Sequence, residues 1–376
     1  MKIVYCVPSM YRLGGVERIV AKKASLLAKR GFDVSIITTD QGERPCYFEI
    51  DDKVKLYDLG INYEKNSKRF FLSKLYHFFY NKYLHKKRIS RLLLELKADI
   101  VISTFFNEMG ILPKMKDGSK KMIEFHFSKH LFHFFRRKGW KGIVDDYIMT
   151  QYTKTLRQYD RFVVLSKEDA ENWSELDNVE VIYNVCPIES SLKSQLTEHR
   201  VISVGRYEFQ KGYDRLIDAW ALISKQVSDW TLHLVGEGSL RQELEAKIKE
   251  LGLENSIFLA GASKDVNKDY LNSSIAVFTS RHEGFLLALV EAESTGLPVV
   301  SFDTPCGPKD IIRNGEDGFL VSNGNIEELA EKLLLLIKDE SLRRTMGNKA
   351  YDNSRRFTEE IIMSQWVSLF ENVLKQ

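Results

Sequence analysis

Short apolar runs alternate with helical patterns along most of the chain, and this alternation constrains the fold more than any other feature. Lys2 to Pro8 form an apolar run of the kind that is buried in a parallel sheet, and residues 16–29 after it have the period of an amphipathic helix. Gly31 ends that helix, and residues 33–38 form a second apolar run. A strand, a crossover helix and a second strand joined by short loops predict a parallel βαβ unit.

The alternation occurs in two series separated by a polar segment, and 376 residues are enough for two domains. In the first series, further strands are predicted at residues 98–103, 121–125, 161–165 and 179–183. In the second series, strands are predicted at 201–204, 231–235, 257–259, 275–279 and 298–302, and helices at 213–225, 240–251, 286–294 and 326–339. We therefore predict an α/β chain with two Rossmann-like, doubly wound domains facing across a cleft.

The domain boundaries follow from the same pattern. We expect a first domain at 1–185, a linker at 186–199, a second domain at 200–355, and a C-terminal helix at 356–376 that packs back across the domain boundary. Residues 1–186 hold 33 Lys/Arg against 23 Asp/Glu, whereas the remainder holds 22 against 29. This asymmetry indicates that the two halves face different partners.

The sequence also predicts the compartment. No apolar stretch approaches the 18 or so residues that cross a bilayer, and no signal peptide is expected. The cysteines are far apart, at positions 6, 46, 186 and 306, so neither a metal site nor a secreted disulfide pattern is predicted. A reducing cytoplasm fits these features.

A loop after the first strand of the second domain carries two cations between glycines. Arg206 and Lys211 lie between Gly205 and Gly212, just before a predicted helix. Glycine allows close backbone approach, and Arg and Lys supply charge-assisted hydrogen bonds, which together suit a diphosphate. An ordinary solvated loop would contain the same residue types, so this stretch alone does not distinguish a diphosphate-binding loop from a solvated one.

Two carboxylates follow a later strand at a spacing of eight residues. If the segment is helical, Glu283 and Glu291 lie roughly 12 Å apart along the axis, about the span from the hexose to the ribose of a nucleotide sugar. The helix N-terminus near Gly284 and Phe285 would then offer N–H groups to phosphate or sugar oxygens, and Glu291 would accept both ribose hydroxyls. Two glutamates at this spacing also occur by chance, so they indicate nucleotide-sugar binding only together with the cationic loop.

Together these motifs resemble the retaining glycosyltransferases of family 4, the group 1 glycosyltransferases, which have the GT-B fold. The resemblance covers residues 201–321 strongly and includes the turn at 236–238, Glu283-Gly284-Phe285, Glu291-Ala292, and the runs at 296–300 and 315–320. The first domain matches more weakly, through the loop at residues 8–18, which contains Gly14 and Gly15.

The resemblance implies roles for particular residues. The donor phosphates would contact Arg206 and Lys211, the ribose Glu291, and the donor sugar Glu283 with the amides of Gly284 and Phe285. The loop containing Gly15 would lie over the donor diphosphate and the acceptor. Leu286 stands where many members carry glycine, which is a departure at the sugar pocket.

The resemblance also concerns the reacting sugar and the donor. His126 falls where the family places a histidine near the sugar, with Glu124 as a second candidate, although a histidine after a strand is often structural. Residues 303–310 resemble a loop of members that use UDP-hexoses or UDP-hexosamines. No Asp-x-Asp triplet occurs, so we expect no metal and no cofactor.

Two segments of the first half combine cations with aromatic residues. Residues 63–94 contain nine Lys/Arg, eight Phe/Tyr and one acidic residue, and residues 129–140 form a second such segment. This composition suits an anionic membrane surface; nucleic acid could use the same chemistry, but the sugar-nucleotide motifs argue against nucleic acid. Charged helices with aromatic residues in the core would have the same composition.

These observations predict a retaining hexosyltransferase, with His126 and Glu283 as catalytic residues and an α-linked product. It would move a hexose or N-acetylhexosamine from a nucleotide sugar, expected to be UDP-linked, to a lipid-linked or polysaccharide acceptor in surface glycan synthesis, at the inner face of the cell membrane. Two alternatives stay open: a GT-B epimerase acting on the nucleotide sugar, and a noncatalytic sugar-nucleotide-binding protein.

Overall fold

The computed structural model describes residues 1–64, 71–188 and 191–376, with the side chains of residues 71–76 outside that description. The chain forms two compact units. Unit 1 contains Met1–Leu165, Ala170–Val185 and Glu359–Gln376; unit 2 contains Ser166–Asp169 and Cys186–Thr358. Each unit is described below by itself.

Unit 1 is built on a seven-stranded parallel sheet in the order β3-β2-β1-β4-β5-β6-β7. Because the order reverses at β1, the sheet is doubly wound, and the loops after β1 and β4 diverge at its carboxyl edge. The strands are β1 Lys2–Val7, β2 Asp33–Thr38, β3 Lys55–Asp58, β4 Ile100–Ser103, β5 Lys120–Glu124, β6 Arg161–Val164 and β7 Val179–Val181.

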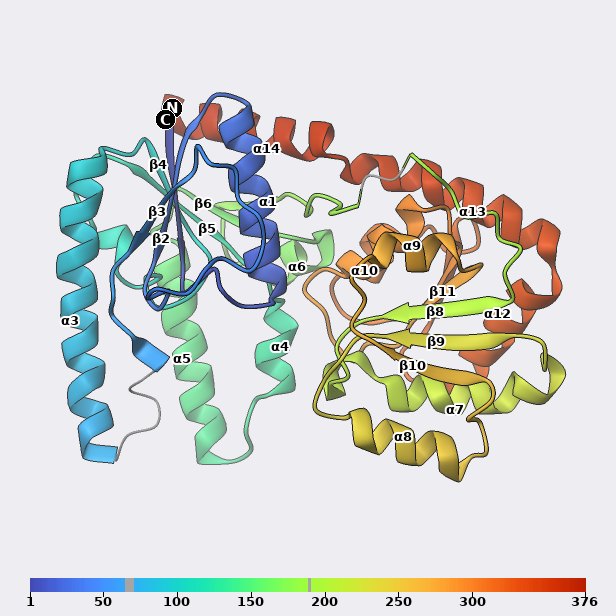
Figure 1. The fold of residues 1–376 in the computed structure, drawn as a ribbon. Coiled ribbons are helices and arrows are strands. Elements are labelled where there is room, and N and C mark those ends of the chain that lie inside the picture. The colour runs from blue at the N-terminus through green and yellow to red at the C-terminus, as the bar shows by residue number, and fades with distance from the viewer. Residues whose placement is uncertain (65–70, 189–190) are drawn as a thin grey trace. The chain divides into compact units, whose positions relative to one another are not determined.

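Both faces of this sheet are covered, which explains why its strands are apolar throughout. Successive side chains of a strand point to opposite faces. In β1, Ile3, Tyr5 and Val7 join one core cluster, whereas Val4 and Cys6 join the other. In Figure 1, α1 and α3 lie on opposite sides of the strands. The helices of unit 1 are α1 Gly15–Lys29, α3 Phe71–Leu96, α4 Lys129–Phe134, α5 Trp140–Leu156, α6 Lys167–Asn172 and α14 Glu359–Lys375. Helix α6 begins in the segment assigned to unit 2, and a short 3-10 turn lies at Leu112–Lys114.

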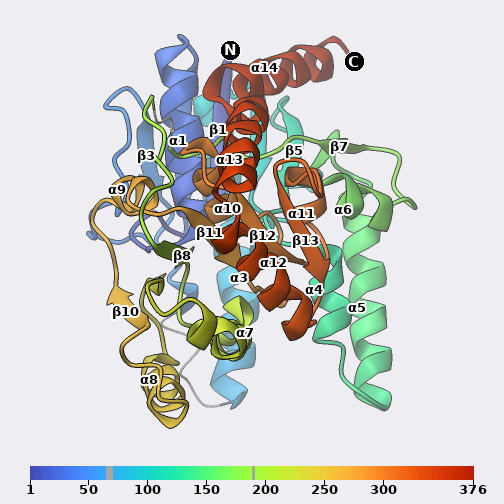
Figure 2. The same ribbon diagram turned by 90° about the vertical axis from the view of Figure 1, so that its right-hand side faces the viewer.

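Helix α14 completes the core on the α1 face of unit 1, although unit 2 precedes it in the chain. Its residues Ile362, Trp366 and Phe370 recur at helical spacing and are buried in the same cluster as Tyr5 and Val20. Helices α1 and α14 are in contact (Figures 1 and 2). The first core is therefore formed by the two ends of the described chain together.

Unit 2 is built on a six-stranded parallel sheet in the order β10-β9-β8-β11-β12-β13. Its order reverses at β8, so the loops after β8 and β11 diverge at its carboxyl edge. The strands are β8 Arg200–Val204, β9 Thr231–Val235, β10 Ile257–Gly261, β11 Ile275–Phe278, β12 Val299–Asp303 and β13 Gly318–Ser322.

The helices of unit 2 also cover both faces of their sheet. Helices α7, α8 and α12 contribute to one large core cluster with the strands, while α10 and α13 lie side by side (Figure 2). The helices are α7 Tyr213–Ile223, α8 Arg241–Glu250, α9 Val266–Leu271, α10 Leu287–Ser294, α11 Pro308–Ile311, α12 Ile326–Lys338 and α13 Glu340–Ser354, with 3-10 turns at Phe209–Lys211, Ser224–Gln226 and Arg355–Phe357.

The predicted fold class, an α/β chain with two Rossmann-like parallel sheets, is confirmed. The edge strands β3 and β13 were not predicted, and of the helices only α1, α7, α8, α10, α12 and α14 were. In addition, the segment Ser166–Asp169 groups with unit 2 rather than with the first domain. None of the described helices is long and apolar enough to cross a bilayer.

Candidate functional site

In unit 2, the two loops singled out by the sequence follow the adjacent strands β8 and β11 and are bonded to each other. The backbone N–H of Arg281 donates to the Gln210 carbonyl at 2.7 Å, and the Gln210 side-chain amide donates to the His282 carbonyl at 3.0 Å. Arg281 also forms two hydrogen bonds to Asp214 of α7. The cationic loop and the carboxylate loop are therefore one structure.

Gly212 makes this close approach possible. Its φ angle is +67°, in the left-handed region that glycine adopts without strain. A Cβ atom at this position would collide with the carbonyl oxygen of Thr279 at the end of β11, because the two atoms would be 2.2 Å apart. The hydroxyl of Thr279 instead donates to the Lys211 and Gly212 carbonyls. Glycine after Lys211 thus has a structural cause.

The approach brings Lys211 and Glu283 together. Lys211 Nζ lies 2.7 Å from Glu283 Oε1, and the two side chains are 18% and 7% exposed. Gln210 Nε2 lies 3.5 Å from the other carboxylate oxygen of Glu283. A cation predicted to bind phosphate and a carboxylate predicted to bind sugar are therefore paired with each other at the carboxyl edge of the sheet.

Arg206 is placed differently from Lys211. Its side chain is exposed, and it lies in the loop that begins at the end of β8 and leads to α7. The neighbouring Tyr207 is fully buried and donates from its hydroxyl to the Leu234 carbonyl at 2.7 Å, which anchors the loop backbone. Arg206 thus projects from a fixed backbone and keeps its charge accessible.

One geometric expectation about the carboxylates is wrong. Helix α10 begins at Leu287, with Leu286 as its N-cap, so Gly284 and Phe285 lie in the turn before the helix and not in its first turn. Only part of the path from Glu283 to Glu291 is helical, and the 12 Å estimate, which assumed a helical rise throughout, does not apply. The Leu287 N–H already donates to the Phe285 carbonyl at 3.0 Å.

Glu291 lies within α10 and is more deeply buried than Glu283. It is 2% exposed, and its Oε2 atom lies 3.5 Å from the hydroxyl of Tyr270 on α9. That hydroxyl also donates to the Ala288 carbonyl at 2.9 Å. The carboxylate is thus oriented by a buried tyrosine, whereas Glu283 is oriented by a lysine.

The loop after β12 packs against the turn that follows Glu283. A Cβ atom on Gly307 would lie 3.5 Å from the Leu286 backbone nitrogen and 3.9 Å from the Glu283 Cβ atom. Leu286 itself is 1% exposed, and the Phe285 ring packs edge-on to Phe357 at 5.8 Å between centroids. Leu286 is therefore part of the apolar packing beneath this turn.

In unit 1, the loop after β1 leads into α1 through two glycines with different surroundings. A Cβ atom at Gly14 would collide with the carboxylate of Glu17, which folds back over it. A Cβ atom at Gly15, the first residue of α1, would meet no atom within 4 Å, and the residue is exposed. A Cβ atom at Gly14 would require only the flexible end of Glu17 to move, and the described structure leaves open space over Gly15.

His126 follows β5 and lies against the last residue of that strand. Its Nε2 atom is 3.1 Å from Oε2 of Glu124, and the two side chains are 4% and 0% exposed. Neither atom makes a well-aligned hydrogen bond within the described part of the chain. Burial alone would raise the pKa of Glu124, but Lys23 and His126 outweigh burial and lower it. A buried anion thus lies beside the predicted catalytic histidine.

Lys23 of α1 supplies the other contact of Glu124, and the sequence analysis missed it. Lys23 Nζ lies 2.5 Å from Glu124 Oε1, with its side chain 2% exposed. Burial lowers the pKa of Lys23, and Glu124 opposes that shift. A signal was available: Lys23 is four residues from both Ile19 and Leu27, on the buried face of α1, where a lysine requires a charged partner.

The cationic and aromatic segments of unit 1 are only partly as expected. Many of their aromatic side chains are exposed, but Arg136 and Arg137 are each paired through two hydrogen bonds or more with Asp146 and Asp145 of α5. Part of the expected positive charge is therefore neutralised. Residues 65–70 of the first segment lie outside the described residues. The exposed aromatic residues are Phe78, Phe79, Tyr80, Tyr83, Phe134, Phe135, Trp140 and Tyr147.

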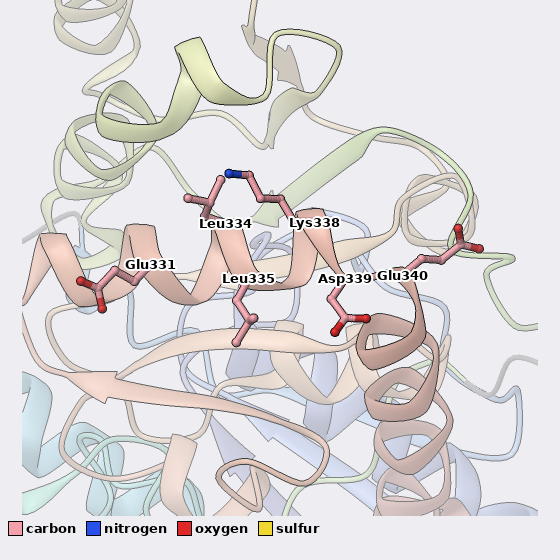
Figure 3. Close-up of a pocket in the computed structure, with 6 residues that line it drawn as sticks. All are labelled: Glu331, Leu334, Leu335, Lys338, Asp339 and Glu340. Atoms are coloured by element: carbon pink, nitrogen blue, oxygen red, sulfur yellow. The ribbon is translucent and has the colours of Figure 1, made fainter.

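A pocket on the surface of unit 2 lies at the junction of α12 and α13 (Figure 3). It is lined by Glu331, Leu334, Leu335, Lys338, Asp339 and Glu340. These residues follow β13 and belong to neither of the loops that hold Lys211 and Glu283. We therefore place the candidate site at the loops and not at this pocket.

Comparisons with known proteins identify the family of this chain. Residues 188–353 match the family model "Glycosyl transferases group 1", and residues 13–189 match "Glycosyltransferase Family 4". The amylovoran biosynthesis glycosyltransferase AmsD of Erwinia amylovora is 30% identical over 97% of this chain and 98% of its own length.

A second relative and a solved structure extend the comparison. A Campylobacter jejuni α-1,4-N-acetyl-D-galactosaminyltransferase, whose full name includes a diphosphoundecaprenol-linked sugar chain, is 25% identical over 99% of both chains. A Staphylococcus aureus TarM variant in complex with fondaparinux, α-GlcNAc-glycerol and UDP has a TM-score of 0.78 at 18% identity, covering 98% of this chain and 99% of its own. This chain belongs to the family 4, group 1 glycosyltransferases of the GT-B fold.

Proposed function

We propose that this glycosyltransferase transfers a hexose or N-acetylhexosamine from a UDP-sugar to a lipid-linked or polysaccharide acceptor in surface glycan synthesis, with retention of the anomeric configuration. The observation that carries the proposal is the Lys211–Glu283 pair at the carboxyl edge of the unit 2 sheet, with Arg206 exposed in the same loop. Ligands of open parallel sheets bind at this edge, where the strand order reverses.

The proposed reaction separates charge at the bond between the sugar and the diphosphate. The bond from the anomeric carbon to the phosphate oxygen breaks, and the electron pair leaves with UDP. A bond from the acceptor oxygen to the same carbon forms on the same face, and the acceptor proton passes to a phosphate oxygen. Arg206 and Lys211 stabilise the developing diphosphate charge, so no protein nucleophile is required.

In this proposal, Lys211 exchanges partners when the donor binds. Its ammonium group leaves Glu283 for the diphosphate, and the released carboxylate accepts hydrogen bonds from sugar hydroxyls. Glu291 accepts from the ribose, the loop containing Gly15 covers the diphosphate, and His126 contacts the reacting sugar. Two cations then neutralise the leaving group without a metal ion. Full activity in EDTA would support this, and complete loss restored by manganese would overturn it.

The relatives support the donor and the acceptor. The TarM variant is bound to UDP, and the C. jejuni relative acts on a sugar chain attached to diphosphoundecaprenol. A panel of UDP- and GDP-sugars tests the donor through release of free nucleotide, and NMR of the product determines the anomeric configuration. A β-linked product from an α-linked donor would exclude retention. An epimer formed without acceptor would indicate an epimerase, and binding without turnover would indicate a noncatalytic protein.

Helices α3 and α5 support attachment to an anionic membrane at the inner face of the cell. α3 has 26 residues, so it is about 39 Å long, whereas the strands of three to six residues span roughly 10–20 Å. Because α3 leads directly into the start of β4, its first half projects beyond the carboxyl edge, the edge where His126 follows β5 (Figure 1). The exposed aromatic residues Phe79 and Tyr83 are on this half.

Helix α5 projects in the same direction because it leads into β6. Its first turns expose Trp140, Ile143 and Tyr147, each more than 60% accessible. Aromatic and cationic side chains of this kind suit the interfacial region of a bilayer. A projecting apolar surface at the histidine edge of unit 1 fits an acceptor that is held in a membrane.

Sedimentation with vesicles tests the attachment. Binding should be stronger on anionic than on neutral vesicles and should weaken between 0.1 M and 1 M salt, where the Debye length falls from about 10 Å to 3 Å. Trp140→Ser should reduce the salt-resistant part, whereas Leu222→Ser, which changes an exposed apolar residue of α7, should not. Equal binding of all proteins to both vesicle types would remove the charge argument, and no binding would favour a soluble acceptor.

A further inference from the structure

Three side chains of unit 1 form a continuous chain from the core to the edge of the sheet. Lys23 Nζ lies 2.5 Å from Glu124 Oε1, and Glu124 Oε2 lies 3.1 Å from His126 Nε2. Each of these side chains is at most 4% exposed. Taking two charges out of water costs several kcal/mol per ion, and a well-packed apolar pair is often at least as stable. Stability alone therefore gives little reason for charges at this position.

Lys23 is enclosed by aromatic rings as well as by Glu124. Its Nζ atom lies 3.7 Å from the ring centroid of Trp366 on α14 and 5.6 Å from that of Tyr5 on β1. Aromatic faces attract a cation without offering it a proton acceptor. Glu124 is thus the partner that accepts hydrogen bonds from Lys23, and Lys23 fixes one oxygen of the carboxylate in place.

The second carboxylate oxygen is then left to face His126. A ring nitrogen that faces a carboxylate carries the proton, because the carboxylate accepts only. With the Nε2 atom of His126 used in this way, a neutral ring keeps its lone pair on Nδ1. Glu17 of α1 also interacts electrostatically with His126 and with Arg12.

We propose that Glu124 is a positioning residue for His126: anchored by Lys23, it holds the Nε2–H tautomer, so that Nδ1 is presented as a hydrogen-bond acceptor to a hydroxyl of the transferred sugar. This rests on the proposed function, in which His126 contacts the sugar. Lys23 acts on His126 only through Glu124, because its charge keeps the buried carboxylate ionised. Trp366 supports Lys23 and links α14 to the same chain.

The first test uses the unmodified protein. ¹⁵N NMR of the histidine rings at pH 8, with the His126 signals identified by their absence in His126→Gln, reports which nitrogen is protonated. We expect protonated Nε2 and unprotonated Nδ1. Protonated Nδ1, alone or together with Nε2, would overturn the proposal without any variant of Glu124 or Lys23 having to fold.

Two variants test the chain behind the histidine. Glu124→Gln should mix the two tautomers, because an amide can both donate and accept. Lys23→Met removes the countercharge, so burial raises the pKa of Glu124 and favours uptake of a proton by the pair; a proton on the ring, or on Oε2 where it donates to Nε2, leaves Nδ1 protonated. Lys29→Met, at an exposed position of the same helix, should leave the spectrum unchanged. An unchanged spectrum in both test variants would refute the role of the chain.

Kinetics separates positioning from donor binding. Glu124→Gln should lower kcat about ten- to a hundredfold with the KM for the donor changed less than threefold, because the side chains assigned to the phosphates and the ribose, those of Arg206, Lys211 and Glu291, are in unit 2. A change in KM alone would contradict a positioning role. If no nucleotide sugar is turned over by the unmodified protein, the proposed function fails, while the NMR result still decides whether Glu124 sets the tautomer.

Discussion

Each unit places a lysine–glutamate pair at or near the carboxyl edge of its sheet, and the two pairs differ in access to water. Lys23 and Glu124 of unit 1 are 2% and 0% exposed, whereas Lys211 and Glu283 of unit 2 are 18% and 7% exposed. The first pair is closed off by the ring of Trp366, and the second lies between two loops. A sealed pair cannot change partners, but a partly open pair can.

The difference separates two uses of the same chemistry. In unit 1, the ion pair stays intact and fixes the carboxylate beside His126. In unit 2, under our proposal, Glu283 pairs with Lys211 until the diphosphate binds in its place. Lys211 therefore does not have to be a partly buried, unpaired charge before the donor binds. The predictions below test this difference.

The largest effect should come from breaking the sealed pair. Lys23→Met leaves Glu124 buried without its countercharge, which typically costs about 3–5 kcal/mol of the free energy of unfolding, whereas Lys211→Met should cost less, because Lys211 is 18% exposed and the Gln210 amide stays near Glu283. Urea unfolding followed by circular dichroism measures both. The double variant Lys23→Met/Glu124→Gln should recover part of the loss, because no charge then remains in the core. Equal costs for the two lysines would remove the distinction.

The open pair should show its effect in ligand binding. Arg206→Ala and Lys211→Ala should each weaken UDP binding about ten- to a hundredfold, since a hydrogen bond to a charged group contributes about 1.5–3 kcal/mol. Isothermal titration calorimetry measures the dissociation constants. Lys225→Ala, a cation of unit 2 outside these loops, is the matched control. UDP binding that is unchanged in both test variants would contradict the phosphate assignment.

A third glutamate, Glu293, shows how burial changes the pKa of a carboxyl group that is not paired with a lysine. Glu293 on α10 is fully buried, and neither of its oxygens makes a well-aligned hydrogen bond within the described residues, although Asn353 lies near it. Burial raises its pKa well above the usual value, and Asp317 adds to the shift. Since the folded pKa is raised, the stability that Glu293 contributes is present at low pH and is lost as the pH rises above about 4.3, the usual value for an unfolded chain.

Glu293→Gln should therefore stabilise the protein at pH 8, and the gain should shrink toward pH 5. Thermal unfolding of both proteins across this pH range measures the difference, in which the other titrating groups cancel. A constant difference at every pH would show that the carboxyl group titrates normally.

The smallest effects should separate the two carboxylates of the donor site. Glu291→Gln should weaken UDP binding about tenfold, because the ribose contacts do not require a sugar on the diphosphate. Glu283→Gln should leave UDP binding unchanged or tighten it up to about threefold, since Lys211 is released from its partner, while turnover falls. Equal weakening of UDP binding by both would contradict the division between ribose and hexose.

The strands that are buried on both faces of a sheet could be predicted from the sequence. Apolar runs such as Ile100–Ser103 have no other stable place than the interior of a parallel sheet, so those strands were predicted within a few residues. The edge strand Lys55–Asp58 was missed because its side chains are mostly exposed and polar, and they carry no apolar pattern. Strand β13 was missed as well; it too lies at an edge of its sheet.

The candidate site was predictable to the extent that it follows from strand ends. Lys211 and Glu283 were placed correctly after adjacent strands, but their pairing depends on hydrogen bonds between loops about 70 residues apart. The helical path assigned to Glu283 was wrong because the apolar residues after Gly284 suit a buried turn as well as a helix. Lys23 is recognisable in the sequence as a lysine on an apolar helix face. Its partner Glu124 is 101 residues away, and the periodicity of a helix cannot predict a contact at that separation.

Helix α14 also determines the order in which the molecule can be completed during synthesis. The core of unit 1 includes Trp366 and Phe370, which leave the ribosome after every residue of unit 2. Unit 2 from Cys186 to Thr358 is continuous apart from the short segment Ser166–Asp169, so it can fold as it emerges. Until α14 arrives, the ammonium group of Lys23 lacks its aromatic cover. A nascent chain can therefore complete unit 2 before the surroundings of Lys23 in unit 1 are complete, and a chain truncated before residue 359 would be a folded second unit joined to an unfinished first one.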